Sequence, residues 1–186
     1  MTDLKPITPL GAGAARIHTI GQVTISENPD RSMASLTTRK GKADAVRLVA
    51  KTALGLDLPG PGQSTISGDF TAWWTGPDQW MIDADHAQYE LLAAHIAQAI
   101  GPVASVTEQT DGWCRFDLTG SGSVALLERL CPADVPTMQP GQATRTLLHH
   151  LGCFVICSTA GFSVLGPRSS AGSLHHALIE AAHSVA

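Results

Sequence analysis

Hydrophobic positions recur at helical spacing in four segments of the chain. In each segment apolar residues stand three or four positions apart, which is typical of a helix with one buried face. Capping residues or Gly and Pro breakers stand at the ends. Asp85 precedes the second segment, where Gln88 completes a capping-box pattern, and Ser121 precedes the third. The pattern predicts helices at residues 42–54, 86–100, 122–131 and 170–184.

Between these helices lie segments whose pattern indicates strands. The clearest is 112–118, where the side chains alternate between the two faces of an extended chain. One face would carry Cys114, Phe116 and Leu118, and the other Trp113, Arg115 and Asp117. Further strands are expected at residues 15–26, 34–39, 69–75, 79–83, 103–109, 145–151, 153–158 and 162–165.

An internal repeat organises these elements. Gly41 and Gly120 each open a predicted helix and stand 79 positions apart, as do Pro61-Gly62-Gln63 and Pro140-Gly141-Gln142. Each half then contains strand pairs and helices in the same order. The sequence predicts an α+β fold: a pseudo-twofold repeat of an antiparallel sheet with helices on one face. The expected divisions are an extended N-terminal arm at 1–13, a first half at 14–101 and a second half at 102–186, with the halves packed as one unit.

Composition narrows the class of protein. The chain has 186 residues, of which 44% are apolar and 15% charged, so it can bury a core. With 12 basic and 16 acidic residues and no basic run, it lacks the positive field of a nucleic-acid binder. The shortage of charge fits a surface covered by partner subunits, and equally a compact monomer rich in Ala and Gly.

The N-terminal sequence indicates the cellular compartment, and the compartment in turn predicts the state of the cysteines. No charged start is followed by an apolar stretch, so we expect no signal peptide, and no apolar run is long enough to span a bilayer. A cytoplasmic protein with no membrane role is therefore expected. In a reducing compartment the four cysteines would be free thiols that pack as small apolar side chains, namely Cys114, Cys131, Cys153 and Cys157.

Several stretches between residues 70 and 180 resemble the gamma subunit family of bacterial heterotetrameric sarcosine oxidase. The longest runs from Val106 through Gln109-Thr110-Asp111-Gly112-Trp113 to Gly120. The others are Gly76-Pro77-Asp78-Gln79-Trp80, Leu127-Glu128-Arg129-Leu130-Cys131-Pro132-Ala133-Asp134, Gly141-Gln142-Ala143-Thr144-Arg145-Thr146 and Gly166-Pro167-Arg168-Ser169-Ser170-Ala171-Gly172-Ser173-Leu174. Residues 1–65 resemble the family mainly in length and layout.

The resemblance implies a fold similar to the folate-binding domain of aminomethyltransferases. It implies a complex with alpha, beta and delta subunits that oxidatively demethylates sarcosine to glycine. The methyl group leaves as formaldehyde or methylenetetrahydrofolate, and oxygen becomes hydrogen peroxide. FAD, FMN, NAD, tetrahydrofolate and zinc would be held by other subunits. No catalytic, cofactor-binding or metal-binding residue is assigned to gamma, so none is carried over to this chain.

Two groups of residues are candidates for interface or anion contacts. Arg168, Ser169 and Ser170 stand at the N-terminus of the last predicted helix, where unpaired backbone N–H groups favour an anion such as a carboxylate. The alternative is an ordinary helix cap with an Arg–Asp ion pair. Trp113 and Arg115 share one strand face and belong to the residue types that anchor interfaces. The alternative is that this face packs within the chain.

The remaining motifs give no support for chemistry on this chain. Gly11-Ala12-Gly13 and Gly120-Ser121-Gly122 lack the rest of a dinucleotide fingerprint, and neither a Walker motif nor a Gly-x-Ser-x-Gly elbow occurs. Adjacent histidines at 149–150 and 175–176 diverge on a strand or a helix and are poorly placed to share a metal ion.

Three functions therefore compete. The first is a non-catalytic subunit of the oxidase complex. The second is a stand-alone folate-binding protein of the same fold, either a one-carbon transferase or an iron–sulfur assembly factor. The assembly factor has the motif Lys-Gly-Cys-Tyr-x-Gly-Gln-Glu. The nearest match here, Pro140-Gly141-Gln142-Ala143, lacks the Cys, the Tyr and the Glu of that motif. The third is a general interaction module.

Overall fold

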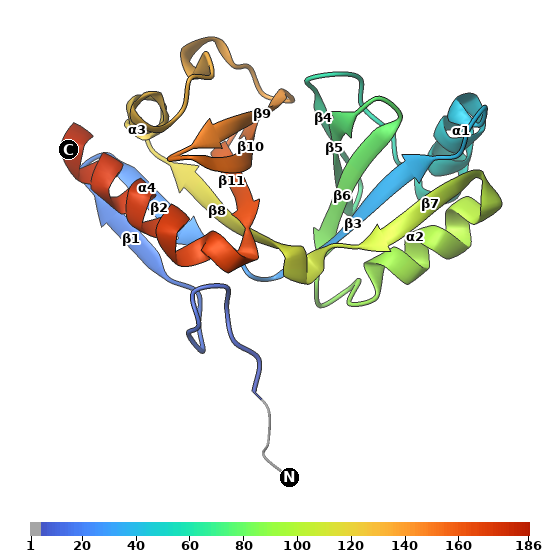
Figure 1. The fold of residues 1–186 in the computed structure, drawn as a ribbon, viewed down its shortest axis with the longest axis horizontal. Helices are drawn as coiled ribbons and strands as arrows, with labels where there is room; N and C mark the ends of the chain where they lie inside the picture. The colour runs from blue at the N-terminus through green and yellow to red at the C-terminus, as the bar shows by residue number, and fades with distance from the viewer. Residues whose placement is uncertain (1–4) are drawn as a thin grey trace. The chain divides into compact units, whose positions relative to one another are not determined.

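The chain forms two compact units, each built from an antiparallel sheet and two helices (Figure 1). The structure, a computed structural model, describes residues 5–186. What we call the terminal unit comprises Met1–Pro29, Asp111–Pro140 and Thr144–Ala186. The middle unit comprises Asp30–Thr110 and Gly141–Ala143. The predicted α+β class with antiparallel sheets is confirmed.

The middle unit has a five-stranded sheet in the order β4-β5-β6-β3-β7. Its strands are β3 (Arg31–Thr38), β4 (Ser64–Ser67), β5 (Phe70–Gly76), β6 (Gln79–Asp85) and β7 (Ala104–Glu108). Its helices are α1 (Ala43–Leu54) and α2 (Leu92–Ile100), and a short 3-10 turn spans Gly101–Val103. Because every strand pair is antiparallel, short connections suffice along most of the sheet.

Both helices of the middle unit bury their apolar stripes against one face of this sheet. The shared core contains Val46 and Ala50 from α1, Leu92 and Ile96 from α2, and Leu36, Trp80 and Ile82 from the strands. Trp80 is fully buried, and its indole Nε1 donates a hydrogen bond to the carbonyl of Pro59 at 2.8 Å. The guanidinium of Arg47 lies 5.0 Å from the Trp80 ring centre. This tryptophan is a core residue.

The terminal unit has a six-stranded sheet in the order β1-β2-β8-β11-β10-β9. Its strands are β1 (Ile17–Ile20), β2 (Val23–Glu27), β8 (Trp113–Thr119), β9 (Ala143–Leu148), β10 (Leu151–Ser158) and β11 (Gly161–Pro167). Its helices are α3 (Ser123–Leu130) and α4 (Ala171–Val185), with 3-10 turns at Thr110–Gly112, Val135–Thr137 and Arg168–Ser170. Figure 1 shows α4 lying along this sheet.

The core of the terminal unit lies between its sheet and α3 and α4. It includes Val23, Ile25, Phe116, Leu118 and Val164 from the sheet, and Leu126, Leu127, Leu174 and Leu178 from the helices. All four cysteines are free and buried, as expected for thiols that pack as small apolar groups.

The predicted repeat is present in the topology. The element order β3-α1-β4-β5-β6-α2 of the middle unit recurs as β8-α3-β9-β10-β11-α4 in the terminal unit. The sheet order β4-β5-β6-β3-β7 corresponds to β9-β10-β11-β8-β2. The two sheets differ in one strand. Strand β2, which precedes the first copy in the sequence, pairs with β8, whereas β7 pairs with β3 in the middle unit.

The two Pro-Gly-Gln copies pair with each other. Gln63 and Gln142 form an antiparallel bridge within the middle unit. The N–H of Ser64 donates to the carbonyl of Gly141 at 2.8 Å, and the N–H of Ala143 donates to the carbonyl of Gly62 at 3.0 Å. In the repeat Gly62 corresponds to Gly141, and Ser64 to Ala143, so the two hydrogen bonds are equivalent. Both glycines have positive φ, +70° and +90°, which explains why glycine recurs there.

The units do not divide the chain at the predicted boundary between 14–101 and 102–186. Strand β2 pairs with β8, through Ile25 and Leu118, and so belongs to the later unit. Strand β7 pairs with β3, through Leu36 and Val106, and so belongs to the earlier one. Strand pairing joins residues distant in sequence, and a repeat read along the chain cannot reveal it.

Helix and strand bounds also differ from the prediction in several places. The predicted helix 86–100 begins only at Leu92, because Asp85 caps a separate turn in which its Oδ1 accepts from the N–H of Gln88 at 3.2 Å. The segment 15–26 is two strands, since Gly21 turns the chain at φ +54°. Strand β4 was not predicted, because Ser64–Ser67 has only one large apolar residue.

The predicted N-terminal arm is only partly extended. Its residues 1–4 lie outside the described residues. Residues Thr8 to Ala12 form a turn in which the N–H of Thr8 donates to the carbonyl of Ala12 at 2.8 Å. The buried carboxylate of Glu27 accepts hydrogen bonds from the N–H groups of Leu10 and Arg16, both at 3.0 Å. The arm is therefore tied to β2. In the described part of the chain, no helix has the length and apolar character needed to cross a membrane.

We expect Gly166→Ala to destabilise the protein. A Cβ at this position on β11 would lie 2.6 Å from Cδ2 of Leu174 and 3.2 Å from Sγ of Cys153, so the buried Leu174 side chain would have to shift. Overpacking of this kind costs about 1–3 kcal/mol. Urea unfolding would measure the change. Gly152→Ala on neighbouring β10 is the control, because nothing lies within 4 Å of its Cβ position. Equal stability of both variants would contradict this packing.

Candidate functional site

The face of the terminal sheet that points away from α3 and α4 carries a cluster of polar side chains. The alternation predicted for β8 is confirmed: Cys114, Phe116 and Leu118 face the helical core. Arg115 and Asp117 therefore lie on the opposite face, where Ser163 of β11 stands beside Asp117. Asn28, just after β2, reaches the same group. We call Asn28, Arg115, Asp117 and Ser163 the β8 polar cluster.

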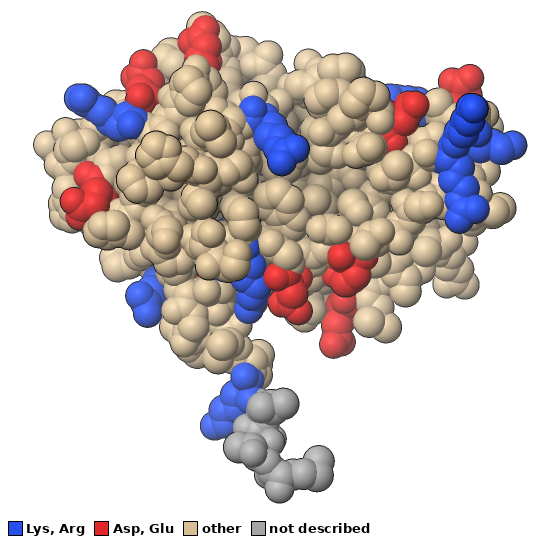
Figure 2. Space-filling view, in the orientation of Figure 1, with Lys and Arg blue, Asp and Glu red and all other residues tan. Residues whose placement is uncertain are grey.

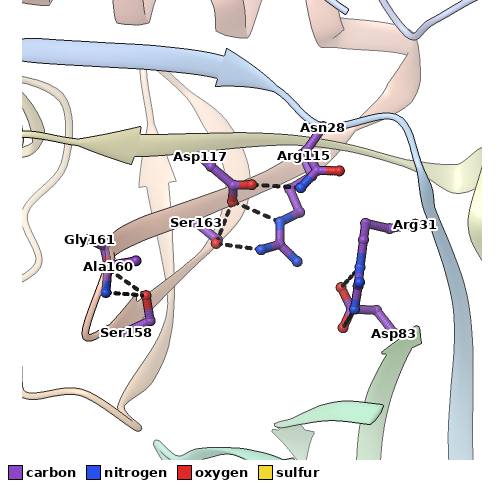
Figure 3. Close-up of polar contacts among 9 residues, drawn as sticks. All are labelled: Asn28, Arg31, Asp83, Arg115, Asp117, Ser158, Ala160, Gly161 and Ser163. Carbon is purple, nitrogen blue, oxygen red and sulfur yellow. Dashed lines mark hydrogen bonds and ion pairs between the residues drawn. The ribbon is translucent and has the colours of Figure 1, made fainter. Parts of the chain in front are cut away.

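Asp117 is the centre of the β8 polar cluster (Figure 3). Its Oδ1 accepts from Nε of Arg115 at 2.8 Å and from Oγ of Ser163 at 2.6 Å. Its Oδ2 accepts from Nδ2 of Asn28 at 2.7 Å. A second guanidinium nitrogen of Arg115 donates to Oγ of Ser163 at 3.0 Å. The cluster thus links three neighbouring strands through their side chains.

The cluster keeps Asp117 ionised. Burial by itself would raise the pKa of this carboxyl, but the charge of Arg115 and the hydrogen bonds from Asn28, Ser163 and Arg115 outweigh it, and the pKa is lowered. A carboxylate that is paired and surrounded by donors is poorly suited to exchange protons near neutral pH. The arrangement is therefore poorly suited to acid–base catalysis.

Trp113 and Arg115 lie on one face of β8, as predicted. Trp113 is half-buried, and its ring centre lies 5.5 Å from that of Phe154 on β10. The guanidinium of Arg145 on β9 lies 5.8 Å from the Phe154 ring centre. Aromatic and guanidinium groups therefore stand side by side along this face, which is the composition of interface anchors.

Arg168, Ser169 and Ser170 form the 3-10 turn before α4, at the predicted place. Nη1 of Arg168 lies 3.5 Å from Oδ1 of Asp111, and its Nη2 donates to the carbonyl of Ile7 at 3.3 Å. Ser170 makes no side-chain cap hydrogen bond to α4. The structure thus contains the Arg–Asp pair weighed as the alternative reading. The carboxylate of Asp111 is 91% exposed, so this pair is screened by solvent.

Sequence reasoning missed a pair of histidines in the terminal unit. The ring centres of His18 on β1 and His175 on α4 lie 5.1 Å apart, and that of Phe116 lies 5.7 Å from His175. Neither Nε2 atom is exposed or has a hydrogen-bond partner among the described residues. Burial first, then the neighbouring His18, lowers the pKa of His175. The positions are 157 apart in sequence, so no local signal predicts the pair.

The buried thiols are weak nucleophiles. Burial raises the pKa of Cys114 and of Cys153 to about 11, and it also raises the pKa of Cys131 and Cys157. Such thiols are protonated at neutral pH and act as packing groups. Among residues 5–186, no three His, Cys, Asp or Glu side chains converge so as to hold a metal ion.

Comparison with known proteins relates the fold to two enzymes. No family model matches the sequence, and no curated protein matches it. Among solved structures, a chain of heterotetrameric sarcosine oxidase from Corynebacterium sp. U-96, in complex with pyrrole 2-carboxylate, is similar at a TM-score of 0.75 and 21% identity. The match covers 88% of this chain and 85% of that one, so the two are of similar length.

The second enzyme is the glycine cleavage system aminomethyltransferase T from Bartonella henselae. Its TM-score is 0.65 at 16% identity, and the match covers 87% of this chain and 46% of that one. This chain therefore spans about half of the aminomethyltransferase. At these identities the likeness establishes the fold, and it confirms the predicted similarity to this fold type.

We expect Asp117→Asn to lower the free energy of unfolding at pH 7 by about 2 kcal/mol, because it removes the charge and one of the two acceptor oxygens of a partly buried group that three donors surround. The lowered pKa of Asp117 stabilises the folded state above the ordinary value of 3.8. This contribution is lost as the pH falls through the folded-state pKa. The variant should therefore lose less of its free energy of unfolding in acid than the parent protein does. Denaturant unfolding at pH 7 and pH 3.5 would measure both effects. Asp134→Asn, at an exposed site, is the control. An unchanged acid dependence would contradict the role of the cluster.

We expect His175 to make the protein less stable in mild acid. Its pKa is lower in the folded state than the ordinary 6.5, so the unfolded chain binds the proton more readily. The free energy of unfolding should fall as the pH drops below 6.5, and His175→Phe should reduce that fall. Urea unfolding at pH 7.5 and pH 5.5 tests this. His183→Phe, exposed on the same helix, should behave like the parent protein.

Proposed function

We propose that this chain is the gamma subunit of a heterotetrameric sarcosine oxidase, with an assembly role in a complex of alpha, beta and delta subunits. The observation that carries the proposal is the fold match, at a TM-score of 0.75, to a chain of similar length in such a complex. The motif resemblance in residues 70–180 supports the same assignment.

The side-chain chemistry supports a non-catalytic role for this chain within the enzyme complex. In the described residues the most elaborate polar group is the β8 polar cluster, whose members bond to one another. The thiols have raised pKa values, which makes them weak nucleophiles. In this proposal catalysis by the complex, from sarcosine to glycine with formaldehyde or methylenetetrahydrofolate and hydrogen peroxide, takes place on other subunits.

The surface supports protein partners over nucleic acid. On the face shown in Figure 2, Lys and Arg are interspersed with Asp and Glu among neutral residues, with no field of one sign. A net charge of −4 would repel phosphates. Several large apolar side chains of the described residues are more than half exposed and could be covered in a complex, namely Ile7, Ile17, Leu48, Ile66, Leu91 and Leu147.

The cofactors belong to the same proposal. FAD, FMN, NAD, tetrahydrofolate and zinc would be bound by the other subunits, and this chain would bind none of them. A cytoplasmic location is part of the same proposal. The alternative is a stand-alone folate-binding protein, which the likeness to aminomethyltransferase T keeps open as an outcome of the test.

The proposal predicts that the chain co-purifies with large flavin-binding subunits and is needed for their activity. Candidate alpha, beta and delta subunits should be co-expressed with and without this chain, with an affinity tag on the beta subunit. We expect co-elution and sarcosine-dependent peroxide with it, and a several-fold loss of active complex without it. Flavin content of the purified subunits, measured by absorbance, distinguishes a complex that fails to assemble from an assembled complex without catalytic activity.

The opposite outcome is equally specific. A chain that stays monomeric in the presence of those subunits, and that binds tetrahydrofolate by itself in calorimetry, would contradict the subunit role. It would favour the stand-alone folate-binding alternative.

A further inference from the structure

The sheet of the middle unit has an open strand position at one edge. In the repeat, the strands β9-β10-β11-β8-β2 of the terminal unit correspond to β4-β5-β6-β3-β7 of the middle unit. The terminal sheet continues past β2 with β1, which pairs with β2 in the antiparallel direction from Ile17 to Ile20. Among residues 5–186, no strand continues the middle sheet past β7. The place that β1 holds in one unit is therefore open in the other.

The open edge of β7 presents backbone groups at alternate residues. In an antiparallel pair, residues that bond to the neighbouring strand alternate with residues whose N–H and C=O point away from it. The N–H of Gln109, just after β7, donates to the carbonyl of Met33 at 2.9 Å. In this register the odd-numbered residues of β7 bond to β3. The even-numbered residues therefore direct their N–H and C=O groups to the open edge, namely Ala104, Val106 and Glu108.

Strand β7 lacks the features that usually protect a sheet edge from further pairing. Proteins guard their edge strands with Pro, with Lys, with a bulge or with very short strands. The 5 residues of β7 include neither Pro nor Lys, and the register with β3 is unbroken from Ala104 to Glu108. Ser105, Thr107 and Glu108 are exposed. This edge is therefore a template on which a further strand can pair.

The helix above this edge leaves room for the side chains of a further strand. In the terminal unit α4 packs on both β1 and β2, and His175 of α4 contacts His18 of β1. The buried Leu92 of α2 corresponds to the buried Leu174 of α4, at the same offset that relates the bounds of β6 to those of β11. Ala93 of α2 therefore takes the position of His175. An alanine at this position leaves space for a side chain of an incoming strand.

We propose that the open edge of β7 binds an extended segment of a partner protein, which adds an antiparallel strand in the place that β1 fills in the terminal unit. The inference rests on the assembly role proposed above, to which it adds a contact site. Backbone hydrogen bonds supply the affinity, and alternate side chains supply the specificity. Side chains of the segment beside the partly buried Val106 should be apolar, because they lie under α2. Those beside Ser105 and Thr107 should be polar, and a basic residue suits Glu108.

A second copy of this chain is a poorer occupant of the edge. Two β7 strands that paired antiparallel in one sheet would place both α2 helices on the same face of that sheet, because paired residues point to the same side. Each α2 packs on β7 and β3, so the two helices would compete for the space above the joined edges. A lone extended segment brings no helix to that face.

Substitution of Val106 by proline tests the backbone pairing. Val106→Pro removes an N–H that points to the open edge and leaves the hydrogen bonds of β7 to β3 in place. Val106→Ala is the matched control, because it shortens the same side chain and keeps the N–H. Each variant would be co-expressed with candidate alpha, beta and delta subunits that carry a tag on beta. Val106→Pro should reduce the amount of this chain that co-elutes about five-fold, and Val106→Ala should reduce it much less.

A peptide titration tests the same edge in the unchanged protein, without the other subunits. A synthetic peptide with the sequence of residues 15–22, which contains β1, would be added to the ¹⁵N-labelled full chain at up to millimolar concentration. A scrambled peptide of the same composition is the control. We expect saturable amide shifts at Val106 and Glu108 with the first peptide and none with the scrambled one. The result does not depend on whether Val106→Pro folds.

The outcomes separate this contact from the assembly role. Full co-elution of a folded Val106→Pro variant, or the lack of any peptide shift at β7, would overturn the proposal and leave the assembly role intact. Peptide shifts at β7 without co-elution of the parent chain would contradict the assembly role and support the strand-binding edge. A dimer in analytical ultracentrifugation that Val106→Pro abolishes would overturn the proposal in favour of a second copy.

Discussion

Pairing of β8 with strands on both sides is the constraint on which the terminal unit depends. Its partner β11 follows it in the chain, but its other partner, β2, precedes it by about ninety residues. The sheet can therefore form only when β2 pairs with a strand that follows β3 to β7 in the sequence. Antiparallel registers through Ile25, Leu118 and Val164 place one apolar face under α3 and α4.

The other face of β8 shows how the chain keeps polar groups at low solvent exposure. Asp117 is poorly exposed, and an isolated charge there would be costly. Donors from three strands surround it, so the carboxylate remains ionised and the strands are held in register. A cluster whose members satisfy one another has little capacity left for a reaction.

The repeat shows where local pattern and tertiary structure agree. Gly62 and Gly141 need positive φ, and the sequence signals both because glycine tolerates that conformation. That the two copies pair with each other, through Gln63 and Gln142, could not be inferred from their spacing of 79. The late start of α2 had a local cause, since Asp85 caps a turn rather than the helix. A capping pattern predicts that a side chain accepts a hydrogen bond from the backbone of the following turn. It does not specify whether a helix continues from that turn.

The sequence by itself determined the α+β class, the repeat, the two faces of β8 and the burial of the cysteines, because each depends on residue type and short-range periodicity. Tertiary structure decided which strands share a sheet, the partners of Asp117, the Arg168–Asp111 pair and the His18–His175 pair. These features depend on contacts between residues far apart in the chain, which periodicity does not encode.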